Sequence, residues 1–321
     1  MNKLAFLFLF MFLHVNGFSQ KPDTLIKKLD SLSKKVDSAG GKQLNNTNPA
    51  AYNEDTRITF RSYFILLGSN LKQEFTKPFH MTKRDWGKFG IFAAGTIALS
   101  FADEPIQKAA LRFRNNNPTG AKVSKYITSF GGSYEFYSLT ALGAYGFIFK
   151  NEKLKNTTLL ASQAYITGGV IESVLKYLTG RTRPSFYDPG KEAEPSFKGP
   201  FSSSRDYNGN RSNSSFPSGH STVAFAAATV YAMEYRKYVW VPIVAYSAAT
   251  LISLSRITEN KHWATDVLVG AALGFLSGRQ IVNNYHRYAK LKAPGQPKNS
   301  VSFSLGYDYG QLRPGLVYHI N

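Results

Sequence analysis

The feature that most constrains this chain is a series of six apolar segments of helical length, rich in Ala, Leu, Gly and Thr. They lie at 89–102, 134–149, 157–178, 220–233, 239–254 and 264–282. None holds an uninterrupted apolar run of about 18 residues, the usual minimum for a transmembrane helix, because polar side chains interrupt it or the segment is too short. The pattern predicts an all-α fold, a bundle of about six core helices.

Two arrangements of these segments follow from the pattern. They either pack as a compact bundle outside the membrane or form marginal spans whose polar residues face a shared interior. If the first segment lies flat and five span, the basic loop residues fall on the cytoplasmic side, as the positive-inside tendency prefers. These residues are Lys150, Lys153, Lys155, Arg236, Lys237, Arg287 and Lys290. The mean hydropathy of -0.24 argues against a chain that is mostly embedded in lipid. The five-span and the non-spanning arrangements both stay open.

The first residues predict export. Lys3 precedes the apolar stretch 4–13, and small residues at Gly17 and Ser19 form a cleavage site, which is typical of a secretory signal peptide. The formal net charge of +19 favours an anionic partner, and cleavage after Ser19 removes one lysine and no acid. The exported protein therefore keeps the basic excess, which favours envelope lipids or phosphate esters over nucleic acid. The absence of cysteine excludes disulfides, thiolate metal sites and a cysteine nucleophile.

The regions flanking the apolar segments have patterns of their own. Leu25, Leu29, Leu32 and Val36 recur at helical spacing, and a polar linker follows. Apolar residues alternate along 301–309 and a second apolar stretch follows a turn, which predicts one hairpin that packs on the helical domain or on a partner. The predicted organisation is a signal peptide at 1–19, an amphipathic helix and linker at 20–80, a helical domain at 81–292 and a hairpin tail at 293–321.

Three short clusters of polar residues lie at corresponding ends of the predicted helices. They are Lys176 to Pro184 (KYLTGRTRP), Pro217 to His220 (PSGH) and Ser255 to Asp266 (SRITENKHWATD). Antiparallel neighbours that run up and down in turn bring all three clusters to one end of a bundle. The sequence therefore predicts a single site there.

The cations and the helix start in these clusters predict a phosphate-binding cradle. Lys176, Arg183 and Arg256 supply positive charge, while Ser218 and Gly219 at a helix start offer a hydroxyl and free backbone amides. Guanidinium groups and helix N-termini bind tetrahedral oxyanions without a metal. We expect neither a metal nor a cofactor in this site.

Two histidines in the same clusters add reactive groups. His262 and Asp266 are four residues apart on one helix face, so the carboxylate can accept from one ring nitrogen and leave the other free to attack. His220 comes from another helix and can protonate a leaving alkoxide. Together with the cradle, these residues predict phosphoryl transfer.

The three motifs resemble those of the type 2 phosphatidic acid phosphatase and vanadium haloperoxidase superfamily. They read Lys176-x6-Arg183-Pro184, Pro217-Ser218-Gly219-His220 and Ser255-Arg256-x5-His262-x3-Asp266, and the resemblance covers about 81 to 290. It implies a helical bundle that hydrolyses phosphomonoesters or pyrophosphates through a phosphohistidine. His262 then resembles the nucleophile, Asp266 its orienting acid and His220 the general acid, while the five cradle residues hold the phosphoryl oxygens. Family members often carry a Gly shortly before the nucleophile, whereas Thr258 to Lys261 precede it here.

The leading hypothesis is an exported, metal-independent lipid phosphatase on the periplasmic face of the envelope, either membrane-associated or integral. Its substrate is phosphatidic acid, an isoprenyl pyrophosphate or a phosphorylated glycolipid. The alternatives are a soluble periplasmic acid phosphatase, a vanadium haloperoxidase and an inactive envelope-binding protein. The long loop at 185–216 is either a lid over the site or a plain solvated insertion.

Overall fold

The computed structural model describes residues 57–187, 191–200 and 211–292, short stretches between 200 and 211, and two strands near the C-terminus. The predicted signal peptide at 1–19 and the predicted amphipathic helix at 25–36 lie outside the described residues and stay predictions.

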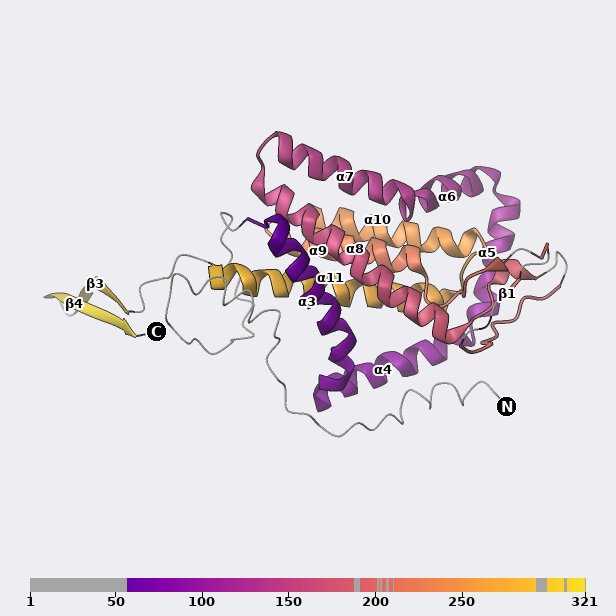
Figure 1. Ribbon diagram of the computed structural model, residues 1–321, viewed down its shortest axis with the longest axis horizontal. Helices are drawn as coiled ribbons and strands as arrows, with labels where there is room; N and C mark the ends of the chain where they lie inside the picture. The colour runs from indigo at the N-terminus through magenta and orange to yellow at the C-terminus, as the bar shows by residue number, and fades with distance from the viewer. Residues whose placement is uncertain are drawn as a thin grey trace.

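Nine α-helices form the described part of the chain (Figure 1). They are α3 (Phe60–Thr76), α4 (Lys83–Ser100), α5 (Asp103–Asn116), α6 (Pro118–Phe130), α7 (Ser133–Ile148), α8 (Glu152–Thr179), α9 (Gly219–Glu234), α10 (Trp240–Thr258) and α11 (Ala264–Lys292). The shorter elements are the 3₁₀ turns η2 (Lys77–His80) and η3 (Pro184–Phe186), and the strands β1 (Ser204–Arg205), β2 (Arg211–Ser212), β3 (Asn299–Asp308) and β4 (Gln311–Ile320).

The prediction of an all-α bundle is confirmed for the described residues. Each of the six predicted segments lies within or largely overlaps a helix, namely α4, α7, α8, α9, α10 and α11. The structure adds α3, α5 and α6, which the predicted series of apolar segments did not include. β3 and β4 run antiparallel, and the expectation that a C-terminal hairpin packs on the helical domain or on a partner stays a prediction.

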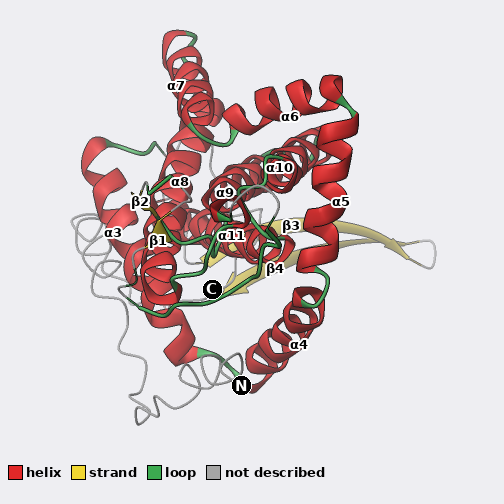
Figure 2. Ribbon diagram, turned by 90° about the vertical axis from the view of Figure 1, so that its right-hand side faces the viewer, coloured by secondary structure: helices red, strands yellow, loops and turns green. Residues whose placement is uncertain are grey.

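Helix α9 lies at the centre of the bundle, between α8, α10 and α11 (Figures 1 and 2). Its residues Ala226, Ala227 and Val230 join Leu160 of α8 and Ile281 of α11 in the main hydrophobic core. Small residues on α9 let its neighbours approach closely, and this close packing fixes the ends of the three helices relative to one another.

Three glycines at a spacing of four make the contact between α11 and α9 close. A β-carbon on Gly270, Gly274 or Gly278 would lie 2.1 to 2.5 Å from a backbone carbonyl oxygen of α9 or of the residue before it. Such distances are far below van der Waals contact, so only glycine fits these positions. The close approach lets the Ser218 amide at the start of α9 donate to the carbonyl of Asp266 in α11 at 3.0 Å.

The end of α8 is set by Gly180, which has a left-handed backbone with φ of 57°. A side chain there would also collide with the carbonyl oxygen of Gly199, at 2.3 Å from its β-carbon. Glycine adopts this conformation without steric cost and is the usual residue just beyond a helix. The turn sends the chain across the end of the bundle, where Arg181 and Arg183 lie.

Helices α4 and α5 are separated by a bend of 57°. Thr82 and Asp85 form a reciprocal capping box at the start of α4. The bend places Asp103, the first residue of α5, in the protein interior with no exposed surface. A buried carboxylate therefore reaches the bundle end from a helix that the apolar pattern did not predict.

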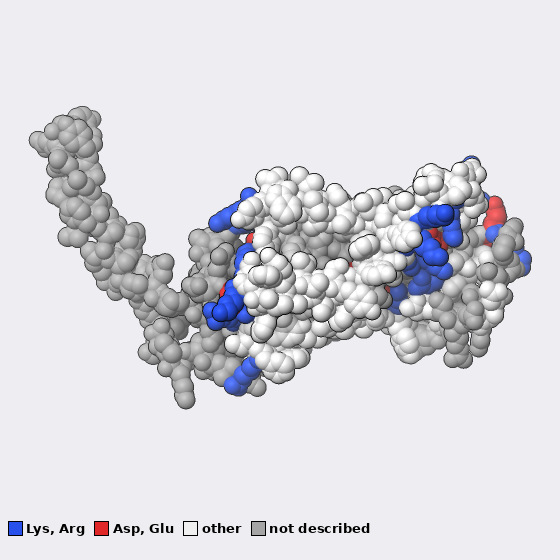
Figure 3. Space-filling model, turned by 90° about the horizontal axis from the view of Figure 1, so that it is seen from above, with Lys and Arg blue, Asp and Glu red and all other residues white. Residues whose placement is uncertain are grey.

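The surface of the bundle divides into charged ends and an uncharged middle. In the view of Figure 3, basic side chains gather at both ends and the surface between them is largely uncharged. Within the described part, α10 is the helix long and apolar enough to cross a membrane by itself, and α4 with α5 passes the same test as a bent pair. The exposed large side chains of α7 and α10 include Phe136, Tyr137, Phe147, Trp240, Ile243 and Val244.

Candidate active site

All three sequence clusters lie at the same end of the bundle. Lys176 is in the last turn of α8, Ser218 caps α9, and Arg256 is in the last turn of α10. His262 follows in the short connection to α11, and Asp266 is in the first turn of that helix. The up-and-down order of α8 to α11 brings the clusters to one end. The prediction that His262 and Asp266 share a helix face was wrong, because α11 begins at Ala264, after His262.

His262 is held by two neighbours on one side of its ring. Its Nδ1 lies 2.7 Å from the carbonyl oxygen of Ser215 and 3.5 Å from Oδ2 of Asp266. A carbonyl oxygen only accepts hydrogen bonds, so Nδ1 carries the proton and Nε2 of the neutral ring keeps its lone pair. The backbone of Ser215 thus holds the ring more directly than the carboxylate on which the sequence argument relied.

Burial and charge keep His262 neutral. Burial lowers the pKa of His262 to about 3, and the cations Arg183 and Lys176 act in the same direction while Asp266 opposes them. Burial alone would raise the pKa of Asp266, but the charge of Arg181 and hydrogen bonds from His262 and Ser215 outweigh it and hold that pKa far below its usual range. A neutral imidazole beside an anionic carboxylate is an arrangement suited to nucleophilic attack.

His220 lies in the first turn of α9 against the turn between α6 and α7. A β-carbon on Gly132 would lie 3.3 Å from Nε2 of His220, and one on Gly131 would lie 3.0 Å from its Cδ2. The pKa of His220 is lowered to about 3, mainly by burial and further by the charges of Arg256, Lys176 and Arg183. The charges of Lys176 and Arg183 therefore lower the pKa of both histidines.

The start of α9 faces a carboxylate in this structure. Glu172 of α8 forms an ion pair with Lys176 one turn later. A β-carbon on Gly219 would lie 2.6 Å from Oε1 of Glu172, so the glycine leaves room for an anionic group at this helix start. The carboxylate of Glu172 therefore lies beside the α9 start and is paired with Lys176, a cation that can also bind an oxyanion.

The two arginines of the predicted cradle are fixed by hydrogen bonds outside it. Arg183 donates from Nε to the carbonyl oxygen of Asn213 at 3.1 Å and from Nη1 to that of Lys261 at 3.3 Å. Arg256 donates from Nη1 to Oγ1 of Thr128 at 3.5 Å. These bonds leave further N–H groups of both guanidinium ions for a ligand. Among the described residues no group of three or more His, Asp and Glu side chains gathers in a way that would hold a metal ion.

Comparison with known proteins decides the family. The model of the PAP2 superfamily matches residues 157–289. Phosphatidylglycerophosphatase B of Bacillus subtilis is 31% identical over 200 residues, which cover 59% of this chain and 86% of that protein. The chain belongs to the PAP2 superfamily. The resemblance expected from the three motifs is confirmed.

For two other relatives of this PAP2 protein, the match covers a smaller share of the relative's own length. A lipid A 1-phosphatase of Porphyromonas gingivalis is 33% identical over 144 residues, which are 44% of this chain but 27% of that protein. An undecaprenyl-diphosphatase of Sulfolobus acidocaldarius is 29% identical and is covered over 63% of its length. The crystal structure of a transmembrane PAP2 type phosphatidylglycerolphosphate phosphatase from Bacillus subtilis matches with a TM-score of 0.46 at 28% identity, over 60% of this chain and 91% of that one.

Several residues around the site of this PAP2 protein were missed by sequence reasoning. Ser215 donates from Oγ to Asp266 and offers its carbonyl oxygen to His262. Arg181 donates to Asp266 from Nη1 at 2.6 Å and to Asp103 from Nη2 at 2.6 Å. Arg181 lies inside the first cluster, and Ser215 lies two residues before the second. A search of these stretches for uncharged hydroxyl side chains, and for a second arginine near Arg183, would have found them. Nothing in the local sequence singles out Asp103.

The residues just before His262 differ from those common in the family, and the structure shows how they are accommodated. Asn260, two residues before His262, has a left-handed backbone with φ of 56°. Asparagine tolerates this region better than most residues other than glycine. Its side-chain oxygen accepts from Gln107 of α5 at 2.9 Å. The connection before His262 therefore keeps a conformation that glycine would also adopt, and it gains a contact with α5.

Proposed function

We propose that this PAP2 protein is a phosphatase that removes a phosphate group from a phosphomonoester or pyrophosphate of a lipid, through a phosphohistidine on His262. The observation that carries the proposal is the state of that ring. It is buried and neutral, its Nδ1 proton is donated to Ser215, and Nε2 is left as the reactive atom. The same two cations, Lys176 and Arg183, act on both histidines.

In the first step, Nε2 of His262 attacks phosphorus, a P–N bond forms, and the bond between phosphorus and the leaving oxygen breaks. The ring becomes cationic while its Nδ1 proton stays on the bond to Ser215, and anionic Asp266 stabilises the new charge. Lys176, Arg183, Arg256, the hydroxyl of Ser218 and the backbone amide of Gly219 hold the phosphoryl oxygens, whose negative charge persists through the transition state. The amide of Ser218 is not part of this set, because it donates to the carbonyl oxygen of Asp266.

His220 serves the leaving oxygen in the same step. In the free site its pKa is lowered by burial and by three cations. A bound phosphoryl dianion offsets those cations, so binding of the substrate raises the pKa of His220 and the ring can deliver a proton. In the second step, neutral His220 takes a proton from water, the oxygen of that water attacks phosphorus, and phosphate leaves as His262 is restored.

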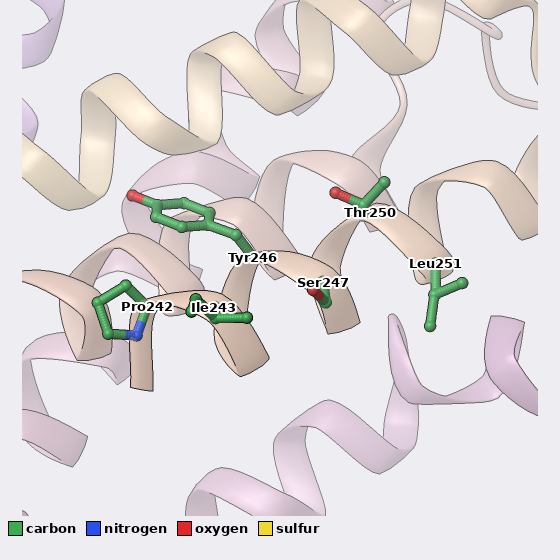
Figure 4. A pocket seen from close by; sticks show the side chains of 6 residues that line it. All are labelled: Pro242, Ile243, Tyr246, Ser247, Thr250 and Leu251. Carbon is green, nitrogen blue, oxygen red and sulfur yellow. The ribbon is translucent and has the colours of Figure 1, made fainter. Parts of the chain in front are cut away.

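The surface along α10, the helix whose last turn holds Arg256, supports a lipid substrate. An open apolar groove of about 590 Å³ runs along α10 and is lined by Pro242, Ile243, Tyr246, Ser247, Thr250 and Leu251 (Figure 4). Ile252, the next residue of α10, approaches Gly131, which adjoins His220. The uncharged middle of the bundle and the exposed apolar side chains of α7 and α10 favour contact with a membrane. Relatives such as the lipid A 1-phosphatase and the phosphatidylglycerophosphatase B also act, by their names, on lipids of this class.

The location at the periplasmic face of the envelope is part of the same proposal and rests on the predicted signal peptide at 1–19. Membrane association distinguishes the lipid phosphatase from a soluble acid phosphatase. In cell fractionation we expect the protein in the membrane fraction, with extraction by detergent. Release by osmotic shock or by high salt would favour the soluble enzyme instead.

The decisive experiment measures phosphate release by the detergent-purified full-length protein and by the His262→Ala variant, with EDTA present throughout. The substrates are dioctanoyl phosphatidic acid, a short isoprenyl pyrophosphate, a phosphorylated glycolipid and the soluble ester p-nitrophenyl phosphate. We expect the wild-type protein to prefer a lipid, vanadate to inhibit it, and His262→Ala to lose turnover.

Three results would contradict the proposal. Normal rates in His262→Ala would exclude the phosphohistidine. Loss of wild-type activity on addition of EDTA would exclude a metal-independent reaction. Oxidation of halide that depends on added vanadate, without phosphate release, would assign the site to a haloperoxidase.

A further inference from the structure

Behind the candidate nucleophile lies a group of three buried charges from three separate parts of the chain. Arg181, in the segment after α8, donates from Nη1 to Oδ1 of Asp266 at 2.6 Å and from Nη2 to Oδ2 of Asp103 at 2.6 Å. The side chain of Arg181 is 2% exposed and those of the two carboxylates are 0% exposed. The guanidinium is therefore a bridge between α5 and the residue behind His262.

Further contacts fix this bridge in one geometry. Thr265 donates from its amide to Oδ1 of Asp103 at 2.9 Å and from Oγ1 to Oδ2 at 2.6 Å. The rings of Phe197 and Trp263 have their centroids 4.9 and 5.7 Å from the guanidinium carbon. Aromatic faces and hydrogen bonds together leave the guanidinium little freedom to turn.

The position of the group relative to His262 links it to the reaction. One oxygen of Asp266 is taken by Arg181, and the other, Oδ2, accepts from Ser215 Oγ and from the amide of Trp263 at 2.8 Å. The same Oδ2 lies 3.5 Å from Nδ1 of His262. Arg181 therefore affects the imidazole through Asp266, because it sets both the position and the charge of that carboxylate.

We propose that Asp103 and Arg181 are positioning residues for His262, which hold Asp266 as a fixed anion behind the ring. The inference rests on the proposed phosphatase function and adds to it a carboxylate from α5, outside the matched region 157–289. Two carboxylates and one guanidinium leave a net negative charge beside His262. That charge favours the cationic ring that forms when Nε2 bonds to phosphorus.

Charge arithmetic gives each variant a different consequence. Without Arg181, Asp103 and Asp266 face each other across Thr265, and like charges at that distance raise the pKa of a carboxylate. Without the charge of Asp103, Arg181 neutralises Asp266 and the net negative charge beside His262 is lost. Loss of both charges together restores a single negative charge on Asp266. The charged groups that face Asp266 and His262 from the elements around them are Asp103 of α5, Lys176 of α8, and Arg181 and Arg183 of the segment after α8.

The test compares Asp103→Asn, Arg181→Gln and the double variant in the full-length protein, with kcat and KM for dioctanoyl phosphatidic acid measured across pH. We expect Asp103→Asn to lower kcat roughly ten- to hundredfold, the range typical of groups that orient a reacting residue, with KM changed by less than about threefold. In Arg181→Gln we expect the acid limb of kcat to move to higher pH, since loss of the cation raises the pKa of Asp266. In the double variant that limb should move back towards the wild-type pH.

A matched control is available at the other end of the bundle. Glu234→Gln removes a buried carboxylate that is paired with Lys153 and His286, far from the site. We expect it to lower the melting temperature and leave the pH profile of kcat unchanged. Binding of vanadate, followed by isothermal titration, provides a second measurement that needs no turnover, and Asp103→Asn should weaken it.

The outcomes separate this inference from the proposed function. Two results would overturn the positioning role. One is an equal effect on kcat and KM that follows the melting temperature, and the other is a double variant whose acid limb does not return to the wild-type pH. In either case an active wild-type protein would still support the proposed phosphatase function. If the wild-type protein releases no phosphate from any substrate of the panel, the proposed function fails. The positioning role is then judged by vanadate binding alone, and unchanged affinity in Asp103→Asn would overturn it too.

Discussion

The two ends of the helical bundle bury carboxylates in different ways. At the end away from the site, Glu234 binds Lys153 at 2.9 Å and His286 at 2.8 Å, and the side chains of these partners are 20% and 15% exposed. At the site end, Asp103, Arg181 and Asp266 are at most 2% exposed.

This contrast separates charges that stabilise the fold from charges that serve the site. Removal of ions from water costs free energy that their attraction seldom returns in full, so a fully dehydrated set is a poor way to gain stability. The partly hydrated group around Glu234 carries a smaller cost of this kind. We therefore infer that the group around Glu234 is structural and that the group around Asp266 is functional.

The largest effect is expected for Asp266→Asn. Loss of the anion removes the charge that stabilises a cationic His262 ring, while the side chain keeps its size. We expect kcat to fall roughly 10²- to 10⁴-fold. Phosphate release from dioctanoyl phosphatidic acid measures the loss, and a cooperative melting curve serves as the control for folding. A kcat within about threefold of the wild-type value would place Asp266 among the structural charges.

At the other end, Glu234→Gln should affect stability and leave catalysis unchanged. We expect the free energy of unfolding to fall by about 2 to 3 kcal/mol, less than the 3 to 5 kcal/mol typical for a broken buried pair, because Lys153 and His286 reach solvent in part. Denaturant unfolding in detergent measures this change. A large loss of kcat without loss of stability would contradict the division.

The same carboxylate predicts a pH dependence of stability. Burial alone would raise the pKa of Glu234, but His286 and Lys153 outweigh it and the pKa is lowered. A group with a lowered folded-state pKa contributes stability that is present above its unfolded pKa, about 4.5, and is lost as pH falls through the folded value. We expect unfolding midpoints between pH 6 and pH 3 to show this loss in the wild-type protein and a smaller loss in Glu234→Gln. Equal slopes in both proteins would contradict it.

The ring of His262 gives a spectroscopic prediction at the site end. Because burial lowers the pKa of His262 to about 3, its ring should stay neutral from pH 8 to pH 5. Nitrogen NMR of histidine-labelled protein measures the protonation state, and His262→Ala identifies the signal. A titration of that signal with a midpoint above pH 6 would show that the site is hydrated and that the burial argument fails.

The smallest effect is expected at the surface. Lys108 of α5 pairs with Glu192 in the long loop at 2.6 Å, and both side chains are well exposed. Water and salt screen such pairs. Lys108→Gln should leave kcat and the melting temperature unchanged within error, and it controls for substitutions elsewhere on the helix that carries Asp103. A clear fall in kcat would indicate that the loop at 185–216 works as a lid.

Much of the fold was predictable because periodicity and helix caps act locally. The apolar segments gave six helices, and the alternating up-and-down order of the last four allowed their ends to be placed together. Helices α3, α5 and α6 were not predicted, because their burial depends on partners that are distant in the chain. Asn70 of α3, for example, donates to Gln163 of α8 at 2.8 Å. A pattern of hydrophobic residues does not indicate such a contact between polar side chains.

The sequence by itself determined the family, the three motifs and the end of the bundle where they meet, because these follow from residue types at fixed spacing. Only the tertiary structure decided which atoms surround His262. The carbonyl oxygen of Ser215 and the bridge from Asp266 through Arg181 to Asp103 join residues up to 163 positions apart. Close packing of α9 on α11 and the bend before α5 bring these residues together. The spacing of Gly270, Gly274 and Gly278 permits the close packing but does not identify the partner helix, and no spacing indicates the bend.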